Sequence, residues 1–386
     1  MDFKVILQVF TGGFLGKTVS WETVEKKLRS VLPLLPVRAL VMGWAFDRSL
    51  YEKTASFLAE RNIDFYLWFP VFSETGSLRE LDPLVGYNGG NVEFPGGGEE
   101  NFSFCCPNQD ANITRILDIY ETEFASIPFK GVFLDKIRYP SFAQAGLEGV
   151  LTCFCPECLK QYKKSLFDAE QLPHLLSCSK KAPLGIHGYL GKGRYLFEDK
   201  NINEFFIVKS ALITRGIKRL CDYFRVKGLS IGLDVFAPFL SLFVGQNLQE
   251  LSKLCDFMKP MMYRATNAPA GLPFETEMLL RETAGGDDHK RYLFYKALGL
   301  DPEKKPFDLN FAAGDLEKLT AVSSCPIYAG VEINRKPNIA EVYPAYIRET
   351  LTAYAGTGIK GFALSWDLLN APRENILKAA RVLEKL

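Results

Sequence analysis

The chain has 386 residues, of which 47% are hydrophobic and 24% charged, so it is long and apolar enough to bury the core of an enzyme-sized domain. Its 46 basic and 45 acidic side chains leave a net charge of +1, which provides no field to attract nucleic acid or an anionic membrane. No stretch of the sequence reaches the length of a membrane span, so we expect neither of these partners.

The start of the chain and the cysteine count bear on the compartment. The sequence enters its first predicted strand at Lys4, which leaves no room for a signal peptide. It contains nine cysteines, and an odd number in a chain of this size argues against a disulfide framework. Both features predict a cytoplasmic protein.

Short runs rich in branched and aromatic residues recur along the chain and predict eight β-strands. They cover Lys4–Phe10, Ala39–Trp44, Asp64–Pro70, Gly131–Tyr139, Leu229–Ala237, Phe257–Tyr263, Pro326–Ile333 and Lys360–Trp366. Apolar residues three and four apart predict helices between and after them, at Trp21–Leu32, Ser49–Glu60, Ile113–Phe124, Asn203–Arg225, Leu248–Cys255, Asp315–Val322, Ile339–Ala355 and Arg373–Leu386. This alternation predicts an α/β fold with a parallel sheet. Eight such units fit a closed (β/α)8 TIM barrel better than a doubly wound open sheet, which is the alternative.

Two long loops interrupt the alternation on either side of the fourth strand. Residues 73–108 include seven glycines, and residues 141–200 include four of the nine cysteines. We predict one domain, residues 1–386, in which both loops cover the mouth of the barrel. Loops on a rigid scaffold carry specificity, so these two are expected to set the substrate range.

The fourth strand ends in a cluster of charges. Gly131–Pro140 reads Gly-Val-Phe-Leu-Asp-Lys-Ile-Arg-Tyr-Pro, so a buried strand delivers Asp135, Lys136, Arg138 and Tyr139 at its exit. Catalytic groups of parallel α/β proteins lie at the carboxyl ends of strands. Asp135 is therefore a candidate catalytic acid, and the alternative is a surface salt bridge with a neighbouring cation.

The other strand ends can be interpreted from alternation, because successive residues of a strand face opposite sides. Small residues share the inward side with four carboxylates, which would then meet at one mouth: Asp135, Asp234, Glu332 and Asp367. Clustered buried acids must either separate their pKa values or use cationic partners. The cations available near strand ends are Lys136, Arg138, Lys259 and Arg264.

Aromatic residues also gather at or near the strand ends. They are Trp44, Trp68, Tyr139, Tyr263 and Trp366, and their flat faces could stack on sugar rings. Alternation places Trp366 toward the helices. Each aromatic residue taken alone is more often part of a core than of a binding platform.

The cysteines provide a second signal. Cys153, Cys155 and Cys158 form a C-x-C-x-x-C knuckle, and Cys105–Cys106 lies on the other loop that borders the same strand. Four soft ligands, separated by enough residues for the chain to surround an ion, suit a tetrahedral zinc site. Free thiols are the alternative. The remaining thiols that we interpret as ordinary buried cysteines are Cys178, Cys221, Cys255 and Cys325.

Asp135 is followed by Ile137-Arg138-Tyr139-Pro140 and then by the knuckle. This pattern resembles the one found in the TIM barrels described as family-10-like or hypothetical glycosyl hydrolases. The cysteine pattern is also similar to the zinc loop of family 42 β-galactosidases. That resemblance implies a structural zinc held by Cys106, or its neighbour Cys105, together with Cys153, Cys155 and Cys158. Leu134–Asp135 stands here where that family has an Asn-Glu pair.

We therefore predict a glycoside hydrolase acting on an oligosaccharide by a two-carboxylate, retaining mechanism with no organic cofactor. Asp135 is the first-choice general acid/base and Glu332 the nucleophile; Asp234 and Asp367 are in reserve, and a pairing of Asp135 as nucleophile with Asp234 as acid is also open. Two other classes remain, a noncatalytic sugar-binding barrel and a lyase or aldolase that uses Lys259. The sequence leaves the sugar, the linkage and any homo-oligomer undetermined.

Overall fold

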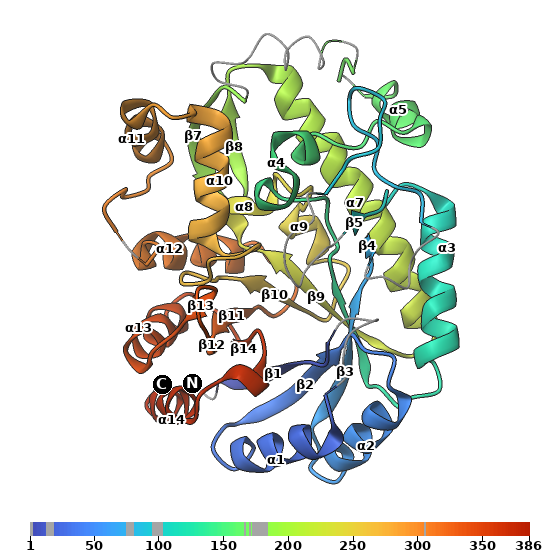
Figure 1. The fold of residues 1–386 in the computed structure, drawn as a ribbon, viewed down its shortest axis with the longest axis vertical. Helices are drawn as coiled ribbons and strands as arrows, with labels where there is room; N and C mark the ends of the chain where they lie inside the picture. The colour runs from blue at the N-terminus through green and yellow to red at the C-terminus, as the bar shows by residue number, and fades with distance from the viewer. Residues whose placement is uncertain are drawn as a thin grey trace.

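Eight parallel strands close into a barrel in the computed structural model (Figure 1), which describes residues 3–12, 19–74, 81–94, 103–165, 167–169, 171, 184–304 and 306–386. In their order around the barrel the strands are β1 (Lys4–Phe10), β2 (Val37–Gly43), β3 (Asp64–Pro70), β6 (Gly131–Asp135), β9 (Ser230–Phe236), β10 (Phe257–Met261), β11 (Tyr328–Glu332) and β14 (Gly361–Ser365). The predicted (β/α)8 barrel is confirmed, and the open-sheet alternative is wrong.

Helices surround the barrel close to the predicted positions. They are α1 (Trp21–Val31), α2 (Arg48–Ala59), α3 (Asp110–Ile119) with a π-helical turn at Tyr120–Phe124, α7 (Lys200–Val226), α9 (Leu248–Leu251), α12 (Leu309–Thr320), α13 (Pro344–Ala355) and α14 (Arg373–Leu383). The helix predicted to begin at Ile339 begins at Pro344 instead. Residues Ala340–Glu341 (β13) pair with Arg335–Lys336 (β12) in a short hairpin, and proline then occupies the first helical turn, which it favours.

Further elements fill the long connections, and the sequence did not predict them. They are β4 (Ser73–Glu74), β5 (Ser103–Phe104), α4 (Phe142–Val150), α5 (Pro156–Tyr162), β7 (Ile186–Gly191), β8 (Arg194–Phe197), α8 (Pro238–Ser241), α10 (Leu272–Ala284), α11 (Asp288–Ala297) and a 3₁₀ turn at Leu368–Asn370. Figure 1 shows α4 beside α10, above the strand ends. The predictions for Cys178 and for parts of both long loops, residues 75–80, 95–102 and 172–183, lie outside the described residues.

Aromatic side chains pack the interior of the barrel. The rings of Phe133 and Phe257 stack with centroids 5.9 Å apart and planes 14° from parallel. Gly232 makes this possible, because a Cβ at that position would lie 2.3 Å from the Phe257 ring and 2.7 Å from the Phe133 ring. The packed interior makes the barrel a solid core, so a ligand can enter only at its ends.

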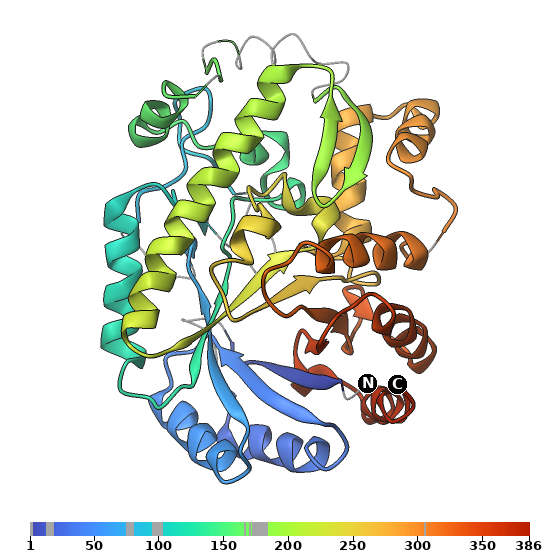
Figure 2. The ribbon, with the colours of Figure 1, turned by 180° about the vertical axis from the view of Figure 1, so that it is seen from behind.

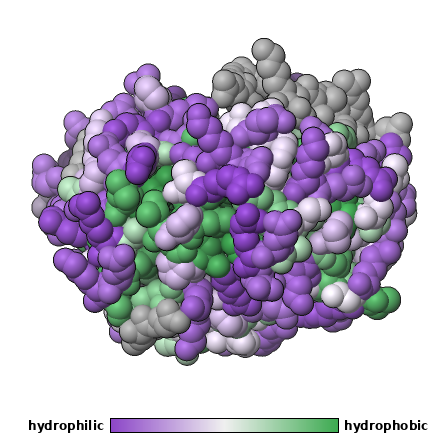
Figure 3. Space-filling model, turned by 90° about the horizontal axis from the view of Figure 1, so that it is seen from below, coloured by the Kyte–Doolittle hydropathy of each residue, from purple (hydrophilic) through white to green (hydrophobic). Residues whose placement is uncertain are grey.

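The outside of the barrel is covered by helices and has a largely polar face. Figure 2 shows α7 running along the back of the barrel, and both ribbon views place α14 beside the start of β1. The face drawn in Figure 3 is largely hydrophilic, with hydrophobic side chains gathered near its middle. Among the described residues, no helix has both the length and the apolar character required to cross a bilayer.

Candidate active site

A cavity of about 540 Å³ opens at the carboxyl ends of the strands. Its walls come from strand ends and from the connections after β10 and β11. The lining residues are Phe10, Trp44, Trp68, Asp135, Lys136, Arg138, Asp234, Met261, Tyr263, Thr266, Ala268, Pro269, Ala270, Lys336, Ile339 and Trp366. Of the residues predicted from the sequence, the cavity brings together Asp135 and Asp234 with Trp44, Trp68, Lys136, Arg138, Tyr263 and Trp366.

Asp135 is the last residue of β6, and two N–H donors hold its carboxylate. The indole Nε1 of Trp68 donates to Oδ2 at 2.9 Å. The backbone N–H of Lys136 donates to Oδ1 at 2.5 Å, and Lys136 adopts the left-handed conformation, with φ of 53°, that ends the strand. The two bonds fix the orientation of the carboxylate, and each oxygen keeps a lone pair for a ligand.

Asp234 lies on the neighbouring strand β9 and forms a buried ion pair. The ammonium of Lys259 on β10 is 3.0 Å from Asp234 Oδ2 and donates to the Tyr263 hydroxyl at 2.6 Å. Gly330 on β11 leaves space for this lysine, since a Cβ there would lie 2.8 Å from Lys259 Cε. Lys259 itself does not line the cavity, so it lies behind Asp234 as its counter-ion.

The surroundings of Asp234 give it a proton affinity suited to acid catalysis. Burial raises the pKa of this carboxyl to about 7, and the charge of Asp135 adds to the increase, while Lys259 opposes it. Its Oδ1 is buried and has no hydrogen-bond partner among the described residues. Asp234 is also one of the residues that line the cavity.

Aromatic rings form one wall of the cavity. The ring of Trp44 packs edge-on against Phe10 at 5.0 Å and against Trp68 at 5.5 Å. Trp366 also lines the cavity, although alternation predicted that it would face the helices. The reason is that β14 ends at Ser365, so alternation along the strand no longer governs the next residue.

Glu332 is placed differently from Asp135 and Asp234. It is fully buried at the end of β11, and it does not line the cavity. Its Oε1 accepts hydrogen bonds from the backbone N–H of Ala265 at 2.8 Å and from the N–H and hydroxyl of Thr266 at 3.1 Å, while the Tyr346 hydroxyl donates to Oε2. Burial raises the pKa of Glu332. Its carboxyl thus holds the connection that follows β10, which carries Thr266 into the cavity wall.

Three other predicted residues also lie away from the cavity. Asp367 accepts bonds from the backbone N–H groups of Phe10 and Leu369, so it caps the 3₁₀ turn after β14. Arg264 donates to the Phe307 carbonyl and the Thr350 hydroxyl. Tyr139 is fully buried, and its backbone N–H donates to a carbonyl in the connection after β9.

The cavity also contains residues that the sequence interpretation missed. They are Phe10, Met261, Thr266, Ala268, Pro269, Ala270, Lys336 and Ile339. The rule that strand ends carry function could have identified Phe10 and Met261, since they end β1 and β10. The connections after β10 and β11 carry no sequence signal of their own. Described residues of the two long loops, which were expected to set specificity, are not among the lining residues.

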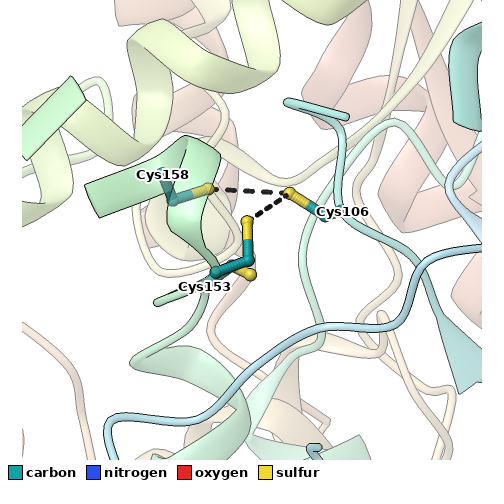
Figure 4. A group of neighbouring side chains, drawn as sticks. Cys106, Cys153 and Cys158 are labelled. Carbon is teal, nitrogen blue, oxygen red and sulfur yellow. Dashed lines mark hydrogen bonds between the residues drawn. The ribbon is translucent and has the colours of Figure 1, made fainter. Parts of the chain in front are cut away.

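Four buried cysteines form a second candidate site (Figure 4). The sulfurs of Cys106, Cys153, Cys155 and Cys158 all lie within 4.8 Å of one another. Cys106 comes from the connection after β3, and the other three come from the connection after β6. Cys105 does not belong to the group, so the structure distinguishes between the two neighbours that the sequence left open.

The surroundings of the cluster suit thiolates. N–H groups of Val85, Asn108 and Gln109 donate to the sulfurs of Cys153, Cys158 and Cys155 at 3.3, 3.8 and 3.6 Å, respectively. Hydrogen bonds from the other three thiols lower the pKa of Cys155, while hydrogen bonds within the same group raise the pKa values of Cys106 and Cys158. Four thiolates within this distance can hold one tetrahedral metal ion, and N–H donors around the ligand sulfurs are typical of such sites.

Comparison with known proteins supports the fold. No protein-family model matches the chain, and no curated protein matches it in sequence. The glycoside hydrolase domain of PgaB (BpsB) from Bordetella bronchiseptica is 13% identical over 99% of each chain, with a TM-score of 0.61. The spore cortex-lytic enzyme SleL from Bacillus megaterium is 8% identical over 99% of this chain and 73% of that one, with a TM-score of 0.49. At 13% identity, the likeness to the PgaB (BpsB) domain concerns the fold alone.

Proposed function

We propose that the protein is a retaining glycoside hydrolase whose catalytic pair is Asp135 and Asp234. The observation that carries the proposal is that these two carboxyls, on neighbouring strands, line one aromatic-walled cavity and have different surroundings. Glycoside cleavage needs one carboxyl that donates a proton and a second that acts as nucleophile or base. The fold shared with the PgaB (BpsB) glycoside hydrolase domain supports the proposal as an analogy between folds.

The two roles follow from the two surroundings. Asp234, with a pKa raised to about 7 by burial, carries a proton near neutral pH and donates it to the leaving glycosidic oxygen. Asp135, oriented by Trp68 and the Lys136 backbone, attacks the anomeric carbon as that bond breaks. The resulting glycosyl ester is then hydrolysed by water, whose proton returns to Asp234.

This assignment is the alternative that the sequence left open, and it differs from the first-choice pair of Asp135 and Glu332. Both oxygens of Glu332 already accept hydrogen bonds from the protein, and Glu332 does not face the cavity. We therefore propose that Glu332 is a positioning residue for the connection that carries Thr266. The polar contacts of Lys259 with Asp234 and Tyr263 likewise favour a counter-ion over the nucleophile of a lyase or aldolase.

A panel of aryl glycosides, assayed with the wild-type protein and with Asp135→Asn and Asp234→Asn, tests the proposal. The wild type should release the aryl alcohol from at least one glycoside, and each substitution should reduce kcat/KM by ~10²-fold or more. The loss of kcat/KM in Asp234→Asn should be smallest on substrates whose leaving group needs no proton.

Asp315→Asn is the matched control, because Asp315 is also a buried carboxyl with a raised pKa, about 6, but it lies on α12 outside the cavity. Its activity should stay close to that of the wild type. Binding of oligosaccharides without cleavage would instead identify a sugar-binding protein. An unchanged rate in both cavity variants would exclude the proposed pair.

We also propose that the four-cysteine cluster holds a structural zinc ion. The donor set supports this proposal, because four thiolates satisfy tetrahedral zinc and leave no position for a reacting water. The ion would join the connections after β3 and β6, to which Cys106 and the knuckle belong. The role of the cluster would therefore be to stabilise the fold and not to take part in catalysis.

A further inference from the structure

Two other cysteines meet at the opposite end of the barrel from the cavity. Cys255 lies two residues before β10, and Cys325 lies three residues before β11. Their sulfurs are 3.5 Å apart, and both side chains are largely buried, with 8% and 9% of their surfaces exposed. From the sequence we interpreted both as ordinary buried thiols. We propose instead that Cys255 and Cys325 are an oxidation site that forms a reversible disulfide, independently of the glycosidase function.

The geometry suits bond formation within the folded protein. A disulfide requires its sulfurs at about 2.0 Å, so the present separation closes with a movement of about 1.5 Å. Within the described part of the chain, each of these two sulfurs is hydrogen-bonded to the other and to no third cysteine sulfur. Cys255 also donates to the Leu251 carbonyl, and the Ser323 hydroxyl lies next to Cys325. The four cysteines of the proposed zinc site form a separate group. Each of the two thiols therefore has one geometrically favoured partner, which is the other thiol.

The two thiols have different chemical surroundings. The hydrogen bond from Cys255 lowers the pKa of Cys325, while the same interaction and burial raise the pKa of Cys255. The negative charge of Asp256 faces both and opposes ionisation of either thiol. This arrangement favours Cys325 as the thiolate that reacts first.

The reaction is a thiol–disulfide exchange with a small-molecule disulfide such as oxidised glutathione. The Cys325 thiolate attacks one sulfur of that disulfide, forms a mixed disulfide and releases one glutathione thiolate. The Cys255 sulfur loses its proton and attacks the Cys325 sulfur, which releases the second glutathione. Two protein thiols are oxidised, and one small disulfide is reduced to two thiols.

The position of the bond predicts its effect. The strands β10 and β11 are joined by the register pair Met261–Gly330 and by an isolated bridge between Met258 and Ile327, which is the sparsest pairing between neighbouring barrel strands in the described chain. A covalent link between the residues that precede these strands would reinforce this junction. It would also close a loop of 70 residues, which restricts the unfolded chain.

The test uses the full-length protein saturated with zinc and treated with oxidised glutathione under native conditions. Free thiols are then alkylated, and the digested protein is analysed by mass spectrometry. The expected result is a peptide pair linked through Cys255 and Cys325, which disappears after treatment with dithiothreitol. The melting temperature should rise on the order of 5 °C on oxidation.

Two variants separate the pair from other thiols. Cys325→Ser should abolish both the linked peptide and the rise in melting temperature. The matched control Cys221→Ser removes a buried thiol of α7 whose pKa burial raises to about 12, and it should retain both effects. Full alkylation of Cys255 and Cys325 after oxidation, or a link that forms only in denaturant, would overturn the proposal.

Discussion

Removal of the Lys259 ammonium tests the proton-donor role of Asp234. If Asp234 is the general acid, it must be protonated in the free enzyme, so kcat/KM should fall as pH rises through its pKa of about 7. Lys259 stabilises the charged carboxylate, and Lys259→Met removes that stabilisation. The pKa of Asp234 should therefore rise, and the alkaline limb of the pH profile should move to higher pH.

The structure gives the scale of this shift. With Nζ and Oδ2 3.0 Å apart and an effective dielectric constant of ~20, the attraction is about 5.5 kcal/mol, equivalent to about 4 pKa units. Water that enters the vacated space will favour the carboxylate and reduce the effect. Asp135, Lys136 and Tyr263 still face the carboxyl in the variant. We therefore expect a shift of at least about 1 unit.

The assay is kcat/KM between pH 4 and pH 10 on the best aryl glycoside, with melting temperatures to confirm folding. Tyr263→Phe serves as control, because it removes a hydrogen-bond partner of Lys259 but leaves the ion pair in place. Its alkaline limb should stay within a few tenths of a unit of the wild type. The opposite result would be a shift of the acid limb of the kcat/KM profile of Lys259→Met, with the alkaline limb unchanged. Asp234 would then act in its ionised form, and the roles of proton donor and nucleophile would be exchanged between Asp234 and Asp135.

Three further predictions concern other parts of the molecule. Glu332→Gln should raise KM by roughly 10-fold, because the connection that carries Thr266 loses a charged acceptor, while azide should not restore its rate in a kinetic assay. Metal analysis should find about one zinc per chain, and Cys155→Ser should lower the melting temperature far more than Cys221→Ser does; protein purified without chelator that lacks zinc would contradict this. Trp366→Ala should raise KM by about 3- to 10-fold through lost stacking, with kcat changed less, and an unchanged KM would place the sugar elsewhere.

The barrel could be predicted because its signals are local. Each strand is a short apolar run and each helix a 3.6-residue pattern, so their alternation is visible without any knowledge of tertiary contacts. Two helices in the connection after β10, α10 and α11, were missed, although α10 buries Leu279 and Leu280. The sequence predicted a single helix in this connection, at Asp315–Val322, which corresponds to α12.

The candidate site could be predicted only in part. Alternation correctly placed Asp135 and Asp234 at the mouth, but it treated Glu332 as equivalent to them. The difference arises because the connection after β10 folds back and supplies the N–H groups of Ala265 and Thr266 to Glu332. Such long-range contacts have no periodic signal in the sequence, and the same is true of the choice of Cys106 over Cys105 as a member of the cluster.

Identification of the residue that becomes covalently attached to the sugar tests the central claim most directly. The 2-deoxy-2-fluoro analogue of the best glycoside substrate, with an activated leaving group, slows hydrolysis of the glycosyl ester so that it accumulates. Mass spectrometry of the inactivated protein should show one added fluorosugar, and peptide mapping should place it on Asp135. A label on Asp234 or Glu332 would contradict the proposed mechanism. Hydrolysis of the unmodified substrate by the wild-type protein with inversion at the anomeric carbon would contradict it as well.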